Sequence, residues 1–163
     1  MSKIIMVFLV ILMIFGGVIG YQYFKQQSNR TEVKINDQSF AAEVASKPEE
    51  WQQGLSDRKS LGEKQAMLFV FDEKKRHSFW MNKMKFPIDI IFIDGNKIVY
   101  IKKDAQPPAS PDEELEIFQP DDPADKVLEI NAGLSDKYGF KPGDEVIIEV
   151  SPTPTEEQAA EEK

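Results

Sequence analysis

The stretch IDIIFI, residues 88 to 93, constrains the fold more than any other part of the chain. Successive side chains of a strand point to opposite faces, so Ile90 and Phe92 share one face. Ile91 and Ile93 share the other, which makes both faces apolar. Because such a strand must be covered on both sides, the sequence predicts either a small barrel or a strongly curved sheet closed by a helix.

A second stretch with two apolar faces follows directly. In residues 97 to 101, KIVYI, simple alternation places Ile98 and Tyr100 on one face. Val99 and Ile101 then lie on the other face. The intervening DGN is a strong hairpin signal, so the two stretches are expected to pair in antiparallel fashion.

Alternation of apolar and polar residues runs through most of the chain and predicts short strands. A short helix is expected within SKPEEWQQGL, because Ser46 and Glu49 have capping-box spacing and Gly54 is suited to end a helix. The predicted fold class is therefore α+β, mainly antiparallel β, in a small barrel-like or strongly curved sheet with one or two short helices. The expected strands are residues 31–35, 39–45, 66–71, 78–81, 88–93, 97–101, 127–130 and 145–150.

The run from Ile4 to Tyr21 contains no charged residue. As a helix it would be roughly 27 Å long, close to the hydrocarbon thickness of a bilayer. The sequence therefore predicts one N-terminal transmembrane helix and makes the lipid bilayer a partner of residues 4–21. The alternative is a cleaved signal, with Val18-Ile19-Gly20 near the cleavage site and a secreted domain. A lipoprotein anchor is excluded because the chain has no cysteine.

The orientation of this segment is predicted from two opposing signals. Lys25, Arg30 and Lys34 after the segment outnumber Lys3 before it, which taken alone favours a cytoplasmic domain. An N-terminal apolar segment followed by a whole domain usually exports that domain. We therefore expect a single-pass protein of the cell membrane with an extracytoplasmic domain.

Composition divides the chain into three parts and limits its chemistry. Residues 1–30 are expected to form the anchor or signal plus a tether, residues 31–150 a single globular domain, and residues 151–163 a disordered acidic tail. The net charge of −8 argues against nucleic acid as a partner. The lack of cysteine excludes disulfides and thiolate chemistry, and no sequence pattern points to a cofactor or a metal.

Asp89 opens the IDIIFI strand at the edge of an apolar layer. A desolvated carboxylate has to find hydrogen-bond donors or a cation, or else take up a proton. Two interpretations are open: Asp89 is a structural pin, or it lines a ligand site. Arg58, the backbone N–H groups of a neighbouring turn or the Trp80 indole N–H could satisfy the carboxylate, and Arg58 is the expected partner.

Trp80 and Asn82 share one face of the expected strand SFWMN, as a stacking platform for a sugar or a base would. The alternative is that Trp80 is an ordinary core residue. His77, the only histidine, is interpreted as an exposed turn residue, and Trp51 as the packing anchor of the short helix.

Two further groups of acidic residues are candidates for chemistry. A hydrolase would need a pair of carboxylates, which Asp89, Glu129 and Asp144 could supply. The acidic residues between Gln106 and Asp125 lack the spacing of a calcium loop and predict a solvated loop.

Five motifs, in this order and spacing, resemble the family called domain of unknown function 192: GLSDRKSL, AMLFVFDE, FWMNKMKFPIDIIFID, VLEINAG and GFKPGDEV. The resemblance implies a compact domain of mixed α and β structure, often behind an export signal or anchor, with no established reaction. The family pattern marks Gly54, Leu55, Arg58, Trp80, Met81, Pro87, Asp89, Glu129 and Gly133. This chain departs from it where Asn82 precedes Lys83 instead of following it, and at Ser56, where Met is common.

The leading functional hypothesis is a non-catalytic module of the cell envelope. It would bind a small molecule, a glycan or an envelope protein through Arg58, Trp80, Asn82, Asp89 and Glu129. The alternatives are a carboxylate-dependent hydrolase acting on envelope carbohydrate and a purely structural or interaction domain.

Overall fold

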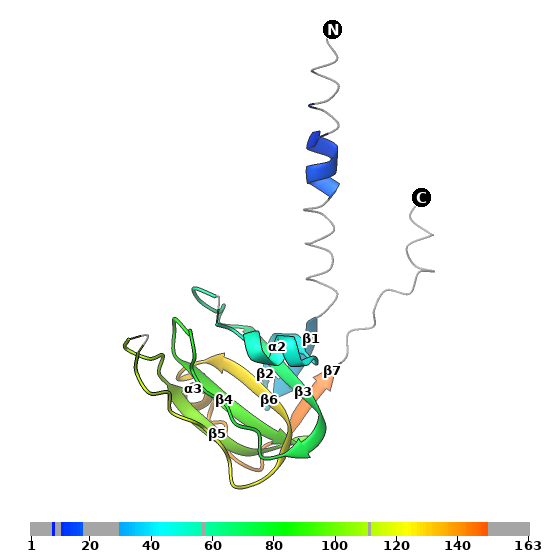
Figure 1. Ribbon diagram of the computed structural model, residues 1–163. Coiled ribbons are helices and arrows are strands. Elements are labelled where there is room, and N and C mark those ends of the chain that lie inside the picture. The colour runs from blue at the N-terminus through cyan, green and yellow to red at the C-terminus, as the bar shows by residue number, and fades with distance from the viewer. Residues whose placement is uncertain (1–7, 9–10, 18–29, 57, 111, 150–163) are drawn as a thin grey trace. The chain divides into compact units, whose positions relative to one another are not determined.

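The computed structural model describes residues 8, 11–17, 30–56, 58–110 and 112–149 (Figure 1). Thr31–Ser151 form one compact unit, and residues 1–30 and 152–163 belong to another. In the latter, residues 8 and 11–17 are helical with exposed apolar side chains. Within the described residues, no helix is both long and apolar enough to cross a membrane. Much of the predicted transmembrane segment, residues 4–21, and the predicted tail, residues 151–163, lie outside the described residues.

The domain is built on one curled sheet with the strand order β5-β4-β6-β3-β2-β1-β7 (Figure 1). Strands β2 and β3 run parallel, whereas β1–β7, β3–β6, β4–β5 and β4–β6 are antiparallel. The parallel pair needs a crossover, and α2 (Pro48–Gln53) supplies it. The strands are β1 (Arg30–Ile35), β2 (Gln38–Ala45), β3 (Gln65–Lys75), β4 (Ile88–Asp94), β5 (Lys97–Ala105), β6 (Ala124–Asn131) and β7 (Val146–Glu149), and a second short helix is α3 (Leu134–Tyr138).

The curl brings the two edges of the sheet together at one end. The Ile98 N–H donates to the Asp144 carbonyl at 3.0 Å, and the Gly143 N–H donates to the Ile98 carbonyl at 2.8 Å. Val146 bonds in the same way to Asn96, also at 2.8 Å. The predicted fold class, a mainly antiparallel and strongly curved sheet with few short helices, is confirmed.

Both faces of the central strands are covered, as the IDIIFI stretch predicts. Ile91 and Ile93 belong to one buried cluster, together with Phe40 and Phe140. The opposite face contributes to a second cluster, whose members include Ile88, Ile90, Phe92, Phe69 and Val127. The strand therefore separates two hydrophobic cores rather than lining one.

The predicted alternation in β5 is wrong beyond Val99. Ile93 pairs with Ile98 and Phe92 pairs with Tyr100, so the register shifts at Val99. Ile101 consequently packs against the same cluster as Ile98, and Val99 against the other. A β-bulge of this kind reverses the faces of the residues that directly follow it, which alternation alone does not reveal.

Two other local predictions need correction. Residues 78–81 do not form a strand, because Phe79 makes only an isolated bridge with Phe118. The capping residue of α2 is Glu50 rather than Glu49: its Oε2 atom accepts from the backbone N–H of Ser46 at 2.8 Å and of Lys47 at 3.2 Å. The helix begins at Pro48, which suits a first helical position because proline has no N–H to leave unpaired.

The predicted end of α2 at Gly54 is confirmed. Gly54 has φ 49° and ψ −132°, a region that residues with a side chain rarely adopt. Its N–H donates to the Glu50 carbonyl at 2.9 Å. A Cβ atom at this position would lie 3.4 Å from the Phe69 ring, an ordinary contact distance, so the backbone conformation rather than lack of space favours glycine.

Candidate functional site

A pocket of about 230 Å³ lies between α2, strand β3 and the segment that follows β3. Most of its wall is aromatic or apolar, and the one carboxylate among its described lining residues is that of Glu129 on β6. The lining residues are Pro48, Trp51, Gln52, Gln53, Gly54, Leu55, Ser56, Phe69, Phe71, His77, Ser78, Phe79, Trp80, Asn82, Met84 and Glu129. The pocket thus combines segments that are far apart in the sequence.

The sheet register places Glu129 in the floor of the pocket. Met67 of β3 pairs with Glu129 of β6 and with Glu43 of β2. Paired residues in adjacent strands point to the same face, so Glu43, Met67 and Glu129 form a row across the sheet. Phe69 and Phe71 share this face because they follow Met67 at steps of two.

Aromatic rings form a continuous wall above this floor. The Trp51 and Phe71 ring centroids are 5.1 Å apart. Phe79 meets Phe69 edge to face at 5.2 Å and Phe71 at 6.4 Å. Trp51 is fixed further by its indole N–H, which donates to the Ala45 carbonyl at 3.1 Å. The rings hold one another in place and keep this side of the pocket apolar.

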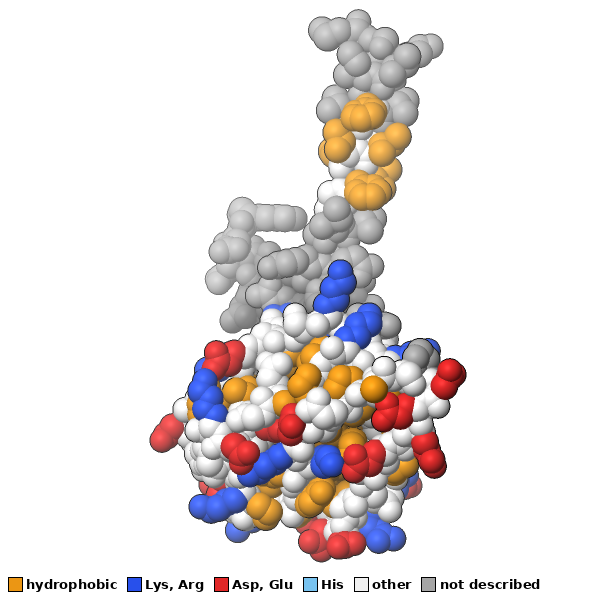
Figure 2. All heavy atoms as spheres, turned by 90° about the vertical axis from the view of Figure 1, so that its left-hand side faces the viewer, with side chains coloured by type: hydrophobic (Ala, Val, Ile, Leu, Met, Phe, Trp, Pro, Cys, Tyr) orange, Lys and Arg blue, Asp and Glu red, His pale blue; other side chains and the backbone are white. Residues whose placement is uncertain are grey.

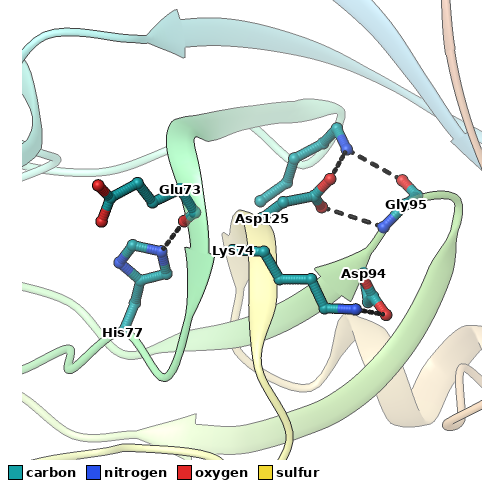
Figure 3. Close-up of polar contacts among 7 residues, drawn as sticks. Glu73, Lys74, His77, Asp94, Gly95 and Asp125 are labelled. Carbon is teal, nitrogen blue, oxygen red and sulfur yellow. Dashed lines mark hydrogen bonds and ion pairs between the residues drawn. The ribbon is translucent and has the colours of Figure 1, made fainter.

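His77 belongs to this wall, which corrects its interpretation as an exposed turn residue. Its ring stacks on Phe71 with centroids 3.6 Å apart and 17° between planes. Its Nε2 atom contacts the Glu73 carbonyl at 3.1 Å (Figure 3). Burial lowers the pKa of His77 below its ordinary value, against a smaller opposing effect of the Glu73 carbonyl. The imidazole is therefore neutral at pH 7.

Polar contacts at the end of β3 fix the start of the segment that carries His77 (Figure 3). Lys74 forms an ion pair with Asp94 at 2.6 Å, joining β3 to the end of β4. The turn after β4 is held in its place by Asp125, whose carboxylate accepts from the Gly95 N–H at 3.1 Å. These contacts anchor the pocket wall to three strands.

Glu129 is the buried polar group of the pocket. Its exposed fraction is 6%, and its Oε2 atom has no hydrogen-bond partner among the described residues. Burial raises the pKa of Glu129 to about 8, and the positive charge of Arg58 opposes this rise. The side chain is thus mostly protonated at pH 7, as expected for a carboxyl group held in an apolar setting.

Arg58 lies beside Glu129 but is bound elsewhere. Its guanidinium donates to both carboxylate oxygens of Glu43, at 2.9 Å and 2.5 Å. The hydrogen bond that Arg58 donates to Glu43 is the largest cause of the raised pKa of Arg58. The expected Arg58–Asp89 contact is wrong. Arg58 binds Glu43 instead, which lies on the same sheet face as Glu129, whereas Asp89 lies on the opposite face.

Asp89 is bonded to backbone instead. Its carboxylate accepts from the N–H groups of Asp104 at 2.9 Å, Gly133 at 3.2 Å and Ser135 at 2.8 Å. It pairs in the sheet with Ile130, which places it on the face opposite Glu129. Asp89 is fully buried and does not line the pocket, so the geometry favours the structural interpretation.

Trp80 and Asn82 both line the pocket. The Trp80 side chain is 47% exposed at the rim rather than buried in the core. Asn82 precedes Lys83, whose φ of 58° marks a turn, and the Met84 N–H donates to the Met81 carbonyl at 3.1 Å across that turn. The structure therefore brings Trp80, Asn82 and Glu129 together, with Arg58 beside them, and leaves Asp89 out.

The carboxylate pairs predicted for a hydrolase are not assembled. Asp144 accepts from the Asn36 side chain at 3.2 Å and from the Lys141 N–H at 3.1 Å, in the turn before β7. Neither Asp144 nor Asp89 lines the pocket, so Glu129 has neither expected partner there.

Trp51, Phe71 and His77 are pocket residues that the sequence did not single out for binding. The position of Phe71 could have been predicted, because it follows Phe69 by two residues and side chains at that spacing share one face of a strand. For Trp51 no local signal exists, because its contact with Phe71 depends on where the parallel crossover places α2. The position of His77 depends on how the segment after β3 folds back onto Phe71, which its polar flanks do not reveal.

The model of the family described as Uncharacterized ACR, the domain of unknown function 192, matches residues 31–148. A structure of a protein of unknown function from Novosphingobium aromaticivorans is similar, with 30% identity, a TM-score of 0.64, and coverage of 72% of this chain and 83% of that one. A second, from Sinorhizobium meliloti, has the provisional description of a transcription regulator; its identity is 28%, its TM-score 0.65, and coverage is 73% of this chain and 92% of that one. No curated protein matches the chain. The chain belongs to the uncharacterised domain of unknown function 192 family.

Proposed function

We propose that this domain is a non-catalytic binding module of the cell envelope, tethered to the membrane through its N-terminal segment. Its binding site is the pocket between α2 and residues 77–84, and its ligand is a small molecule, a glycan unit or a side chain of an envelope protein. The proposal keeps Trp80, Asn82 and Glu129 as binding residues. Arg58 orients the floor from beside the pocket, and Asp89 has a structural role.

One observation carries the proposal: an aromatic pocket contains a buried carboxyl group with an unpartnered oxygen. Buried polar groups are almost always hydrogen-bonded, and an unpaired one costs stability. A ligand with a complementary polar group would remove that cost. The pocket volume of about 230 Å³ is below the roughly 300 to 1,000 Å³ of drug-sized ligand sites, so the ligand or the inserted group is small.

The charge of the protein supports a partner other than nucleic acid. The net charge is −8, and acidic and basic side chains are interspersed on the face shown in Figure 2. Nucleic acids are bound through clustered lysine and arginine side chains that neutralise phosphates. The description of the Sinorhizobium meliloti protein as a regulator is therefore no argument for DNA binding by this chain.

Tryptophan fluorescence tests the proposal, because the chain contains two tryptophans and both line the pocket. We expect a ligand from a panel of envelope sugars, amines and short envelope peptides to change the emission of the full chain and to raise its melting temperature. Trp51→Phe and Trp80→Phe variants assign the change to either side of the pocket. A panel in which no compound alters either signal would contradict the proposal.

A second candidate function is an enzyme that uses Glu129 alone as a proton donor and acceptor. The observation in its favour is the raised pKa, since an acid–base group works best when its pKa lies near the operating pH. The two functions differ in what happens to a bound compound. Recovery of the ligand unchanged after long incubation supports binding, whereas conversion that Glu129→Gln abolishes supports the enzyme.

A further inference from the structure

We infer that the pocket binds a small organic ammonium ion, with Glu129 as its counterion and the aromatic side chains as its cage. The inference rests on the proposed binding function and names the class of ligand. It is carried by the charges, the rings and the unpartnered oxygen that meet in the pocket.

The charges in and beside the pocket favour a cation. The lining residues, all within the described part of the chain, include one carboxyl group and no lysine or arginine. The nearby Arg58 is neutralised by two hydrogen bonds to Glu43. When Glu129 is ionised, the group of Glu43, Arg58 and Glu129 carries a net charge of −1, which a monovalent cation would balance.

The rings favour the same ligand. The faces of aromatic rings carry partial negative charge, and they attract ammonium groups most strongly where water is excluded. Trp51, Phe79 and Trp80 reach the pocket from α2 and from the segment after β3, whereas the stacked His77 ring covers one face of Phe71. An anionic ligand would meet these faces and the Glu129 carboxyl group with no opposing charge in the lining.

The unpartnered oxygen of Glu129 supplies the polar contact. A primary or secondary ammonium would donate a hydrogen bond to Oε2, and a quaternary ammonium would meet the carboxylate through charge alone. Either would compensate the buried acid more completely than a neutral sugar, because a charge-assisted contact is stronger than a neutral one.

Binding of a cation is then coupled to release of a proton. Free Glu129 is mostly protonated at pH 7, and a bound cation favours its ionised form. Within the described part of the chain, the other charged or titratable groups near it are His77 in the lining, which is neutral above its lowered pKa, and the Arg58–Glu43 ion pair. Affinity for the cation should therefore rise with pH up to about 8 and level off above it.

The experiment compares choline with its carbon analogue, in which a neutral quaternary carbon replaces the nitrogen. Tryptophan emission of the full chain in detergent is titrated with each compound from pH 6 to pH 9. We expect choline to bind at least about tenfold more tightly at pH 8, with an affinity that falls up to about tenfold for each unit of pH below that. Glu129→Gln should remove both the preference and the pH dependence, and the matched control Glu32→Gln, an exposed acid on β1, should retain both.

Equal binding of the two compounds, or a preference for choline that survives in Glu129→Gln, would overturn the inference. Failure of choline to bind would overturn it as well. None of these outcomes decides the proposed binding function, because uncharged sugars and peptides in the wider panel test the pocket without a cation.

Discussion

Glu129 occupies a position where its neighbours on the same sheet face, Met67 and Val127, are buried and apolar. A carboxyl group there costs folding energy unless it stays protonated. Its pKa is raised to about 8 in the folded domain, whereas in the unfolded chain it has the ordinary value near 4.5. The residue thus acts against stability at the pH of most cells, which is common for residues kept for binding.

This difference predicts how stability depends on pH. Between about pH 4.5 and pH 8 the unfolded chain has lost the Glu129 proton while the folded domain retains it, so the free energy of unfolding should fall as pH rises and level off above about 8. Glu129→Gln removes this contribution and should raise the free energy of unfolding by roughly 1 to 3 kcal/mol at pH 7. Urea unfolding at pH 6, 7 and 8 measures both effects. Parallel pH profiles of the two proteins would show that Glu129 is not buried as an acid.

The residues of the pocket show where reasoning from sequence ends. Trp80 and Glu129 stand out because each is a polar or amphipathic residue within an apolar motif. The partner of Arg58 could not be deduced, because Glu43 and Asp89 are equally plausible carboxylates until the sheet register places Glu43 on the face of Glu129. The prediction for His77 is wrong for a different reason: its polar flanks indicate exposure, whereas its ring stacks on Phe71.

At the scale of elements, Asp89 connects three parts of the fold. Its carboxylate on β4 accepts from Asp104, which has φ 49° near the end of β5. It also accepts from Gly133 and Ser135, at the entry to α3. The carboxylate thereby satisfies N–H groups that neither the sheet nor the helix can pair internally.

Asp89→Asn should break this connection. An amide presents N–H donors to backbone N–H groups on one side of the side chain, so at least one buried donor loses its partner. We expect a loss of roughly 2 to 4 kcal/mol in the free energy of unfolding. Ligand affinity of the protein that remains folded should be unchanged, because Asp89 lies on the face opposite the pocket. Denaturant titration and fluorescence titration of the same variant check the two parts, and a variant of normal stability with weakened binding would reverse the assignment.

The elements were predictable to the extent that side-chain alternation governs them. IDIIFI predicted a strand covered on both sides, and the buried clusters on its two faces confirm it. The bulge at Val99 was not predictable, because a register shift depends on the partner strand and leaves no mark in local alternation. Residues 78–81 have the composition of a strand, but the structure gives them only the Phe79–Phe118 bridge.

At the scale of the whole molecule, the proposal requires the domain to reach the envelope. The apolar segment predicted over residues 4–21 is the feature on which this part of the proposal depends. Alkaline phosphatase, which is active only outside the cytoplasm, fused after residue 150 should therefore be active, whereas a cytoplasmic reporter at the same site should be silent. Replacement of three apolar residues of the segment by lysine provides the control and should abolish export. The opposite reporter pattern would place the domain in the cytoplasm.

The pairing of β1 with β7 has a consequence for how the chain reaches its native state. Glu32 of β1 lies opposite Glu149 of β7. One edge of the first strand of the domain is therefore paired only when the last strand has formed. During synthesis the N-terminal part is made first, and until β7 is available that edge of β1 offers unpaired backbone groups to other chains. The pairing of two strands that lie this far apart in the sequence is also slow compared with the formation of local contacts. A chain truncated before Val146 would therefore lack strand β7 and would aggregate more readily, because the edge of β1 would stay unpaired.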